Sequence, residues 1–201
     1  MSDDFTTLLP TTELDAVNAM LDTIGEQPIA TLSDIEAADA GTALRRLQQV
    51  SRAVQLKGWN WNTEEDVVVS PNGEGFLVLP SNTLKVIPSD YEYKTLVQRG
   101  ARLYDPVGRT FTFDAPYRAT LVVSLAFEEI PEAGRQYIML KAAEVFQQGV
   151  LGSTTLDQFA KQAMSEALAQ LSAAESQSGR HNVLLGGSWD VYRVINRRGF
   201  W

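Results

Sequence analysis

Apolar residues recur at every third or fourth position in the first part of the chain, which is the spacing of one helical face. The first series comprises Leu14, Val17, Leu21 and Ile24. Thr12 and Asp15, at its start, have the spacing of a capping box. A second series begins after Ser33 and Glu36 and ends near Gly58; its apolar positions are Ala40, Leu44, Leu47, Val50 and Val54. The pattern predicts two amphipathic helices.

The middle of the chain changes to a period of two, which is typical of strands that bury alternate side chains. The alternation is clearest after Arg118, at Leu121, Val123, Leu125 and Phe127, and it also occurs at Phe111 and Phe113. Further short strands are predicted at 66–70, 76–79, 84–87, 93–98 and 101–105. Turn sequences rich in Pro, Gly, Asn and Asp separate these segments. A β region is therefore expected here.

Helical spacing returns after Pro131, a residue well suited to a first helical turn. The first of two further series comprises Ile138, Ala142, Val145, Phe146 and Gly149. The second follows another capping-box pair, Thr154 and Asp157, and comprises Leu156, Phe159, Ala163, Ala167, Leu171 and Ala174. Its small residues favour close packing of helices.

These patterns together predict an α+β fold, in which a four-helix bundle is interrupted by an inserted antiparallel β domain. The bundle halves are expected at 1–60 and 130–178, and the β domain at 61–129. Residues 179–201 mix glycine, arginine and aromatic residues with neither period. We expect them to form an extended C-terminal tail without a core of its own.

The composition excludes several kinds of chemistry. The chain has 201 residues, no cysteine and a single histidine, His181, which we expect on the surface. Thiolate nucleophiles, disulfides and the common Cys- or His-based zinc sites are therefore excluded, and we predict no catalytic residues, no metal and no cofactor. The 44% apolar fraction allows a sizeable core. No apolar run is long enough to span a membrane, and the acidic N-terminus is unlike a signal peptide. We therefore expect a soluble protein made in a cytoplasm.

The charge is unevenly distributed along the chain. Residues 180–201 contain four arginines and one aspartate, a net charge of +3, which leaves −11 on residues 1–179 out of the total of −8. Tight binding of nucleic acid requires a basic face that releases counterions. The acidic body therefore argues against DNA as a specifically bound ligand.

Two clusters of carboxylates could in principle serve glycan hydrolysis, which requires two acids at a fixed separation. They are Glu64, Glu65 and Asp66, and Glu128, Glu129 and Glu132. Acidic residues near a helix start are also what the helix dipole favours, so we interpret the clusters as structural. Trp59 and Trp61 are two residues apart, so in an extended chain their side chains would point to the same face. We expect them to pack in the core at the helix-to-strand junction instead of forming a sugar-stacking platform.

Several motifs with intact spacing resemble a known family. They are Thr12-x-Leu14-x-Ala16-Val17-Asn18, Ile24-Gly25-Glu26-x-Pro28, Gly58-Trp59-x-Trp61-Asn62-x-Glu64, Tyr104-Asp105, Glu129-Ile130-Pro131-Glu132 and Arg135-x-Tyr137-Ile138. In this order they resemble the tail tubular protein A family of T7-like, short-tailed bacteriophages, over about residues 12–175.

The resemblance implies a structural role. It implies a head-to-tail adaptor in the virion, located in the tail at the portal vertex and made in the host cytoplasm. Twelve copies would form a ring between the portal protein and the tail nozzle formed by tail tubular protein B, and genome DNA would pass through the ring without specific binding. The family pattern carries no catalytic residues to this chain. A tail-associated glycan hydrolase that uses the carboxylate clusters is the alternative.

The C-terminal segment is the predicted partner-binding surface. Its aromatic and basic residues are Trp189, Tyr192, Arg193, Arg197, Arg198, Phe200 and Trp201. Aromatic and arginine side chains are the types that most often anchor interfaces, and a segment without a core can order on binding. The portal protein or a neighbouring copy is the expected partner, and the nozzle is the alternative.

Overall fold

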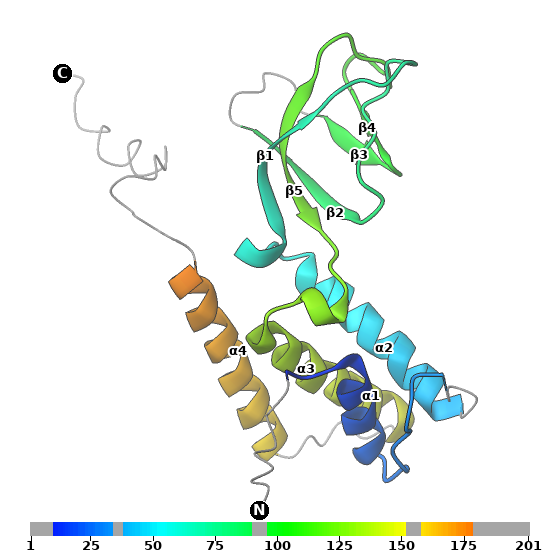
Figure 1. Cartoon of the computed structure of the whole chain (residues 1–201), viewed down its shortest axis with the longest axis vertical. Coiled ribbons are helices and arrows are strands. Elements are labelled where there is room, and N and C mark those ends of the chain that lie inside the picture. The colour runs from blue at the N-terminus through cyan, green and yellow to red at the C-terminus, as the bar shows by residue number, and fades with distance from the viewer. Residues whose placement is uncertain (1–9, 34–37, 90–95, 152–157, 179–201) are drawn as a thin grey trace, which may run out of the picture.

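The computed structural model describes residues 10–33, 38–89, 96–151 and 158–178 (Figure 1). Its helices are α1 (Glu13–Asp22), α2 (Ala38–Gln55), α3 (Glu132–Leu151) and α4 (Gln158–Ser178). Its strands are β1 (Thr63–Val69), β2 (Thr83–Pro88), β3 (Val97–Arg99), β4 (Arg102–Tyr104) and β5 (Tyr117–Val123). Short 3-10 helices, η1 (Asn60–Asn62) and η2 (Phe127–Glu129), flank the β region. The predicted α+β class is confirmed.

The first three helices enclose one hydrophobic core, which contains most of the positions in their predicted apolar series. Its buried members include Val17 and Leu21 of α1, Leu47 of α2, and Ile138 and Phe146 of α3. The capping box of α1 is present: Asp15 N donates to Thr12 Oγ1 at 3.1 Å, and Thr12 N donates to Asp15 Oδ2 at 2.9 Å. The second predicted start includes Glu36, which lies outside the described residues.

Glycines stop the first two helices near the predicted places. Gly25 and Gly58 each follow a helix by three residues and have φ angles of +77° and +80°. Only glycine adopts this left-handed conformation without strain. At Gly58 a Cβ atom would also lie 3.1 Å from Val122 Cγ2 of β5, so any other residue would require that methyl group to move by a few tenths of an ångström.

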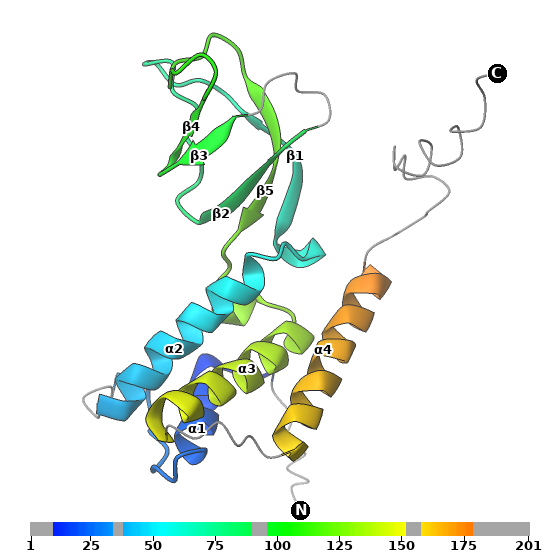
Figure 2. The same ribbon diagram turned by 180° about the vertical axis from the view of Figure 1, so that it is seen from behind.

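Helix α4 lies on the outside of this three-helix core. It packs along α3, which separates it from α2 (Figure 2). Ala167 and Leu171 of its predicted stripe are buried, whereas Ala174 is exposed. At its C-terminal end, Glu175 accepts a hydrogen bond from Asn60 N of η1, and Asn60 Nδ2 donates to the Glu175 carbonyl at 3.2 Å. A single four-helix bundle is therefore not confirmed, because α4 is an added layer; the capping pair predicted for it lies outside the described residues.

The β region consists of a small antiparallel sheet in the order β1-β5-β2 and a hairpin of β3 and β4 (Figure 1). Tyr117, Ala119, Leu121 and Val123 of the central strand β5 are buried in a second core. Leu125 packs against both this core and the helical core. The expected inserted β region is thus present between the helices.

Two strand predictions were wrong. Segments 76–79 and 111–113 form only isolated bridges, including Phe76 with Thr112 and Val78 with Arg102, because their backbone groups bond to several different segments instead of one strand. The alternation after Arg118 also overstated the strand, which ends at Val123. Leu125 cannot continue the ladder, since its N–H and carbonyl both bond to the side chain of Gln55, at 2.7 and 3.2 Å.

Candidate functional site

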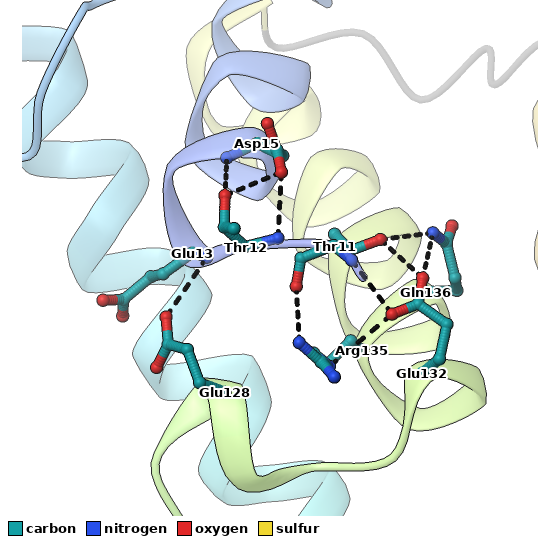
Figure 3. A network of polar contacts seen from close by, with 8 residues as sticks. All are labelled: Thr11, Thr12, Glu13, Asp15, Glu128, Glu132, Arg135 and Gln136. Atoms are coloured by element: carbon teal, nitrogen blue, oxygen red, sulfur yellow. Dashed lines mark hydrogen bonds and ion pairs between the residues drawn. The ribbon is translucent and has the colours of Figure 1, made fainter. Parts of the chain in front are cut away.

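A network of polar contacts fixes the segment before α1 to the first turn of α3 (Figure 3). Thr11 donates to Glu132 twice, from its N–H at 3.0 Å and from its hydroxyl at 2.7 Å. Arg135 Nη1 donates to the Thr11 carbonyl at 2.9 Å, and Gln136 donates to both Thr11 and Glu132. The motifs around Thr12 and around Glu129 to Arg135 therefore meet in space although about 120 residues separate them.

The network changes the acidity of its carboxyl groups. Burial opposes ionisation of Glu132, but hydrogen bonds from Gln136 and Thr11, with the charge of Arg135, outweigh it and lower its pKa. Hydrogen bonds from Thr12 likewise lower the pKa of Asp15. Burial and the neighbouring charge of Glu128 raise the pKa of Glu13. A carboxyl with a lowered pKa is a poor general acid, so Glu132 does not suit that role.

The second carboxylate cluster has the structural role that we expected. Glu128 accepts a hydrogen bond from Glu13 N at 3.4 Å, and Glu129 accepts one from Ala126 N at 2.9 Å. Together with Glu132, which accepts from Thr11 N, these side chains satisfy backbone N–H groups near the starts of α1 and η2. None of these contacts forms a pair of acids across a cleft.

The first carboxylate cluster lies on β1 and is exposed to solvent. Asp66 is 2.9 Å from Arg118 of the neighbouring strand β5, a surface ion pair. Asp66 also has a φ angle of +56°, at a point where the register between β1 and β5 shifts. Glu64, Glu65 and Asp66 therefore form an acidic stretch on an edge strand, next to Val68, whose surface is 48% exposed.

The two tryptophans of the junction pack as expected, although the local backbone differs from the prediction. Trp61 lies in η1, not in an extended segment, and its ring stacks on Trp59 with centroids 6.5 Å apart. Trp59 is 5% exposed, and its indole N–H donates to the Val54 carbonyl at 2.9 Å. The interpretation of Trp59 as a core residue is confirmed.

A mostly apolar groove of about 450 Å³ lies between α2, α3 and α4. The lining side chains are Val50, Ala53 and Val54 of α2, Lys57 and Trp59 from the segment that follows α2, Tyr137, Lys141 and Val145 of α3, and Leu168 of α4. Lys57 Nζ lies 4.2 Å from the centroid of the Trp59 ring, and Lys141 pairs with Glu144 at 2.7 Å. The groove therefore offers apolar surface bordered by two ammonium groups.

Sequence reasoning missed this groove. One wall comes from α2, which lies far from α3 and α4 in the chain, and the order in which α3 separates α2 from α4 is not visible in any one periodic pattern. Ala53 and Lys57, four residues apart beside the predicted apolar face of α2, were the available local signal, because such spacing places both side chains on one side of a helix.

The predicted tail surface comes after Ser178, the last described residue. Trp189, Tyr192, Arg193, Arg197, Arg198, Phe200 and Trp201 all lie outside the described residues, as does His181. Within the described ranges, no group of three His, Cys, Asp or Glu side chains is arranged to hold a metal ion. None of the helices in those ranges is both long and apolar enough to cross a membrane.

Comparisons with known proteins agree with the resemblance carried by the motifs. The sequence model of a family described as Tail tubular protein matches residues 14–181. The chain is 29% identical over 152 residues to Tail tubular protein A of Klebsiella phage KP34, covering 75% of this chain and 80% of that relative. The family match spans nearly all of the helical and β regions described above, so the chain belongs to the tail tubular protein family of phage tail components.

Proposed function

We propose that this chain is a structural head-to-tail adaptor, twelve copies of which form a ring between the portal protein and the tail nozzle. The family match over residues 14–181 carries the proposal. The exposed apolar groove supports it, because apolar surface bordered by polar groups is characteristic of protein–protein contacts. The function then resides in surfaces, and the ring sits at the portal vertex of the virion after synthesis in the host cytoplasm.

The charge of the chain is compatible with passage of genome DNA through such a ring. The total charge is −8, and residues 1–179 alone carry −11. A wall that repels phosphates lets DNA slide without forming the many counterion-releasing contacts that tight binding requires. DNA is thus a passing cargo of the proposed ring and not a specific ligand.

The portal protein, the nozzle and neighbouring copies are the proposed partners. Residues Trp189, Tyr192, Arg193, Arg197, Arg198, Phe200 and Trp201 remain the proposed contact for the portal or for another copy. No observation favours the glycan hydrolase alternative. Glu128, Glu129 and Glu132 bind backbone N–H groups, and Trp59 is buried. We therefore propose a non-enzymatic role.

Imaging of the full chain mixed with portal-containing heads tests the adaptor role. We expect electron cryo-microscopy to show a ring of added density at the portal vertex, with twelve-fold symmetry and an open lumen. Heads from the same preparation without the added protein serve as the control. Density elsewhere on the particle, or no attachment while the protein remains folded, would contradict the proposal.

A further inference from the structure

We propose that the groove between α2, α3 and α4 receives strand β1 of a second copy of this chain. The inference rests on the proposed ring and names the surfaces through which its subunits meet. It starts from two exposed features of the same molecule, the groove and the acidic edge strand, which do not cover each other within one copy. Val68 remains 48% exposed, and the groove remains open.

Strand β1 has one edge available for a partner. The sheet order β1-β5-β2 places β1 at the edge, paired only with β5 among the described strands. Exposed edge strands are avoided or protected in soluble proteins because they pair with other chains. Here Glu64, Glu65 and Asp66 provide protection, since two copies of β1 side by side would bring like charges together. A partner for β1 therefore has to be cationic.

The groove has the matching chemistry. Val50, Ala53 and Leu168 provide apolar surface for a side chain such as Val68. Lys57 and Lys141 border this surface, and lysine stems cover apolar neighbours while their ammonium groups remain able to pair with carboxylates. Since Asp66 pairs with Arg118 and Lys141 with Glu144 inside one copy, the proposed contacts between copies join Lys57 to Glu64 and Glu65.

This pairing has the symmetry that a ring requires. Each copy carries one groove and one β1, so the contact is head-to-tail, and such contacts close into a ring when the rotation between neighbours allows it. Complementary charges also set the register between partners. A chain of net charge −8 needs such local complementarity, because its copies otherwise repel one another.

Cysteine cross-linking tests the contact directly, because the chain has no cysteine of its own. Val68→Cys and Ala53→Cys are placed in separate full-length chains, mixed in equal amounts, bound to portal-containing heads and oxidised. A disulfide needs Cα atoms within about 7 Å, so we expect a cross-linked dimer containing one chain of each kind. Val107→Cys, at an exposed position in the β region, replaces Val68→Cys in the control mixture, where we expect at least five-fold less dimer.

The outcomes separate the inference from the proposed function. A ring visible by electron microscopy without the mixed dimer overturns the inference and leaves the adaptor role intact. Dimers of Val68→Cys with itself, or cross-links from Ala53→Cys to the portal protein or to a cysteine introduced in the C-terminal segment, overturn it as well. If no ring forms on the heads, the proposed function fails and the inference fails with it.

Charge reversal provides a second test that does not depend on cross-linking geometry. We expect Glu64→Lys with Glu65→Lys to reduce ring occupancy on heads at least ten-fold, and Lys57→Glu to do the same. When all three changes are made in one chain, β1 carries the lysines and the groove carries the glutamate, so the two surfaces again have opposite charges. We expect occupancy to recover to within about two-fold of wild type. Equal melting temperatures exclude unfolding as the cause. Loss without recovery, or no loss, contradicts the pairing.

Discussion

Glu132 accepts two hydrogen bonds from Thr11, one from the backbone N–H at 3.0 Å and one from the hydroxyl at 2.7 Å. The two residues are 121 positions apart in the chain, and their contact fixes the segment before α1 to the first turn of α3. A single carboxylate therefore joins the segment before α1 to the third helix. Its charge state should affect the stability of the whole helical part.

We expect acid to weaken this contact. The folded pKa of Glu132 is lowered from 4.5, so its stabilising contribution is fully present above the unfolded pKa and is lost as the pH falls through the folded pKa. The pKa of Asp15 is also lowered, so its contribution to stability is likewise lost as the pH falls. The pKa of Glu13 is raised, so its contribution has the opposite pH dependence and is lost as the pH rises. Glu132→Gln should lower the melting temperature near pH 7, and this difference from wild type should shrink steadily below about pH 4.5.

Thermal melting of both proteins across this pH range measures the effect. Asp15→Asn, which removes the charge from the capping box but leaves Glu132 in place, serves as a matched variant with the same sign. A difference between wild type and Glu132→Gln that stays constant from pH 7 to pH 3 would show that the charge of Glu132 does not contribute.

Trp59→Ala and Leu47→Ala should mainly destabilise the fold. Leu47 is 1% exposed in the helical core and Trp59 is 5% exposed at the junction, and truncation of such side chains costs about 2–5 kcal/mol. Denaturant unfolding measured by circular dichroism gives the loss in the free energy of unfolding. Wild-type stability combined with lost binding to the portal would contradict the assignment of either residue to the core.

The buried side chain of Asn62 holds the junction between the helices and the sheet. Its Nδ2 donates to the carbonyls of Gln55 at 2.9 Å and Val123 at 2.8 Å, and its Oδ1 accepts from Trp59 N at 2.8 Å. Each buried polar group left without a partner costs about 1–3 kcal/mol. Asn62→Ala should therefore lower the free energy of unfolding by about 3 kcal/mol.

Asn82→Ala is the matched control for that measurement. Asn82 is exposed, and its side chain donates to the carbonyl of Ser124, the residue after Val123, at 3.1 Å. We expect a loss below about 1 kcal/mol, as for other surface positions. Equal losses for the two variants would mean that burial at Asn62 adds nothing to the junction.

The sequence predicted the helices better than the sheet. The reason is that neighbouring residues specify the helices, whereas residues far away in the chain determine where the strands end. The period of α1 and α2 and the capping pair of Thr12 and Asp15 are local, so nearby residues specify them. The end of β5 depends on Gln55, which lies 70 residues earlier and takes both backbone groups of Leu125. No local pattern around Leu125 records that contact.

The same distinction explains the candidate sites. The structural role of Glu132 was predictable from its position at a helix start, but its partner Thr11 was not. The groove depends on α4 lying against α3 with Glu175 bonded to Asn60, and amphipathic spacing in α4 predicts a buried face without identifying the helix that covers it. Packing between elements is therefore what the sequence pattern leaves undetermined in the helical part.

Self-association without the portal should be weak at low salt. The chain carries a net charge of −8, and at an ionic strength of 0.1 M charges interact over a screening length of about 10 Å. We expect static light scattering to report monomers at low ionic strength. A stable closed ring at low salt, with no portal present, would show that the portal does not template assembly, although the adaptor role would survive.

Removal of the C-terminal segment should separate stability from attachment. The contacts that hold α4 involve Asn60, Ala167, Leu171 and Glu175, all of which remain in a chain that ends after Ser178. We therefore expect the helical and β signals in far-ultraviolet circular dichroism and the melting temperature to change little. Binding to portal-containing heads should weaken, because the removed residues include the aromatic and arginine side chains proposed to anchor a partner.

A full-length variant isolates the side chains from the length of the segment. Arg193→Ser, Arg197→Ser and Arg198→Ser remove charge, and a separate variant with Trp189→Ala and Trp201→Ala removes aromatic surface. If the arginines and the tryptophans both anchor the partner, each variant should bind heads less tightly than wild type and more tightly than the truncated chain. The reason is that interface energies concentrate in aromatic and arginine side chains. Complete binding and infectious particles with the truncated chain would place the contact surface on the folded body, where the groove is then the first surface to examine.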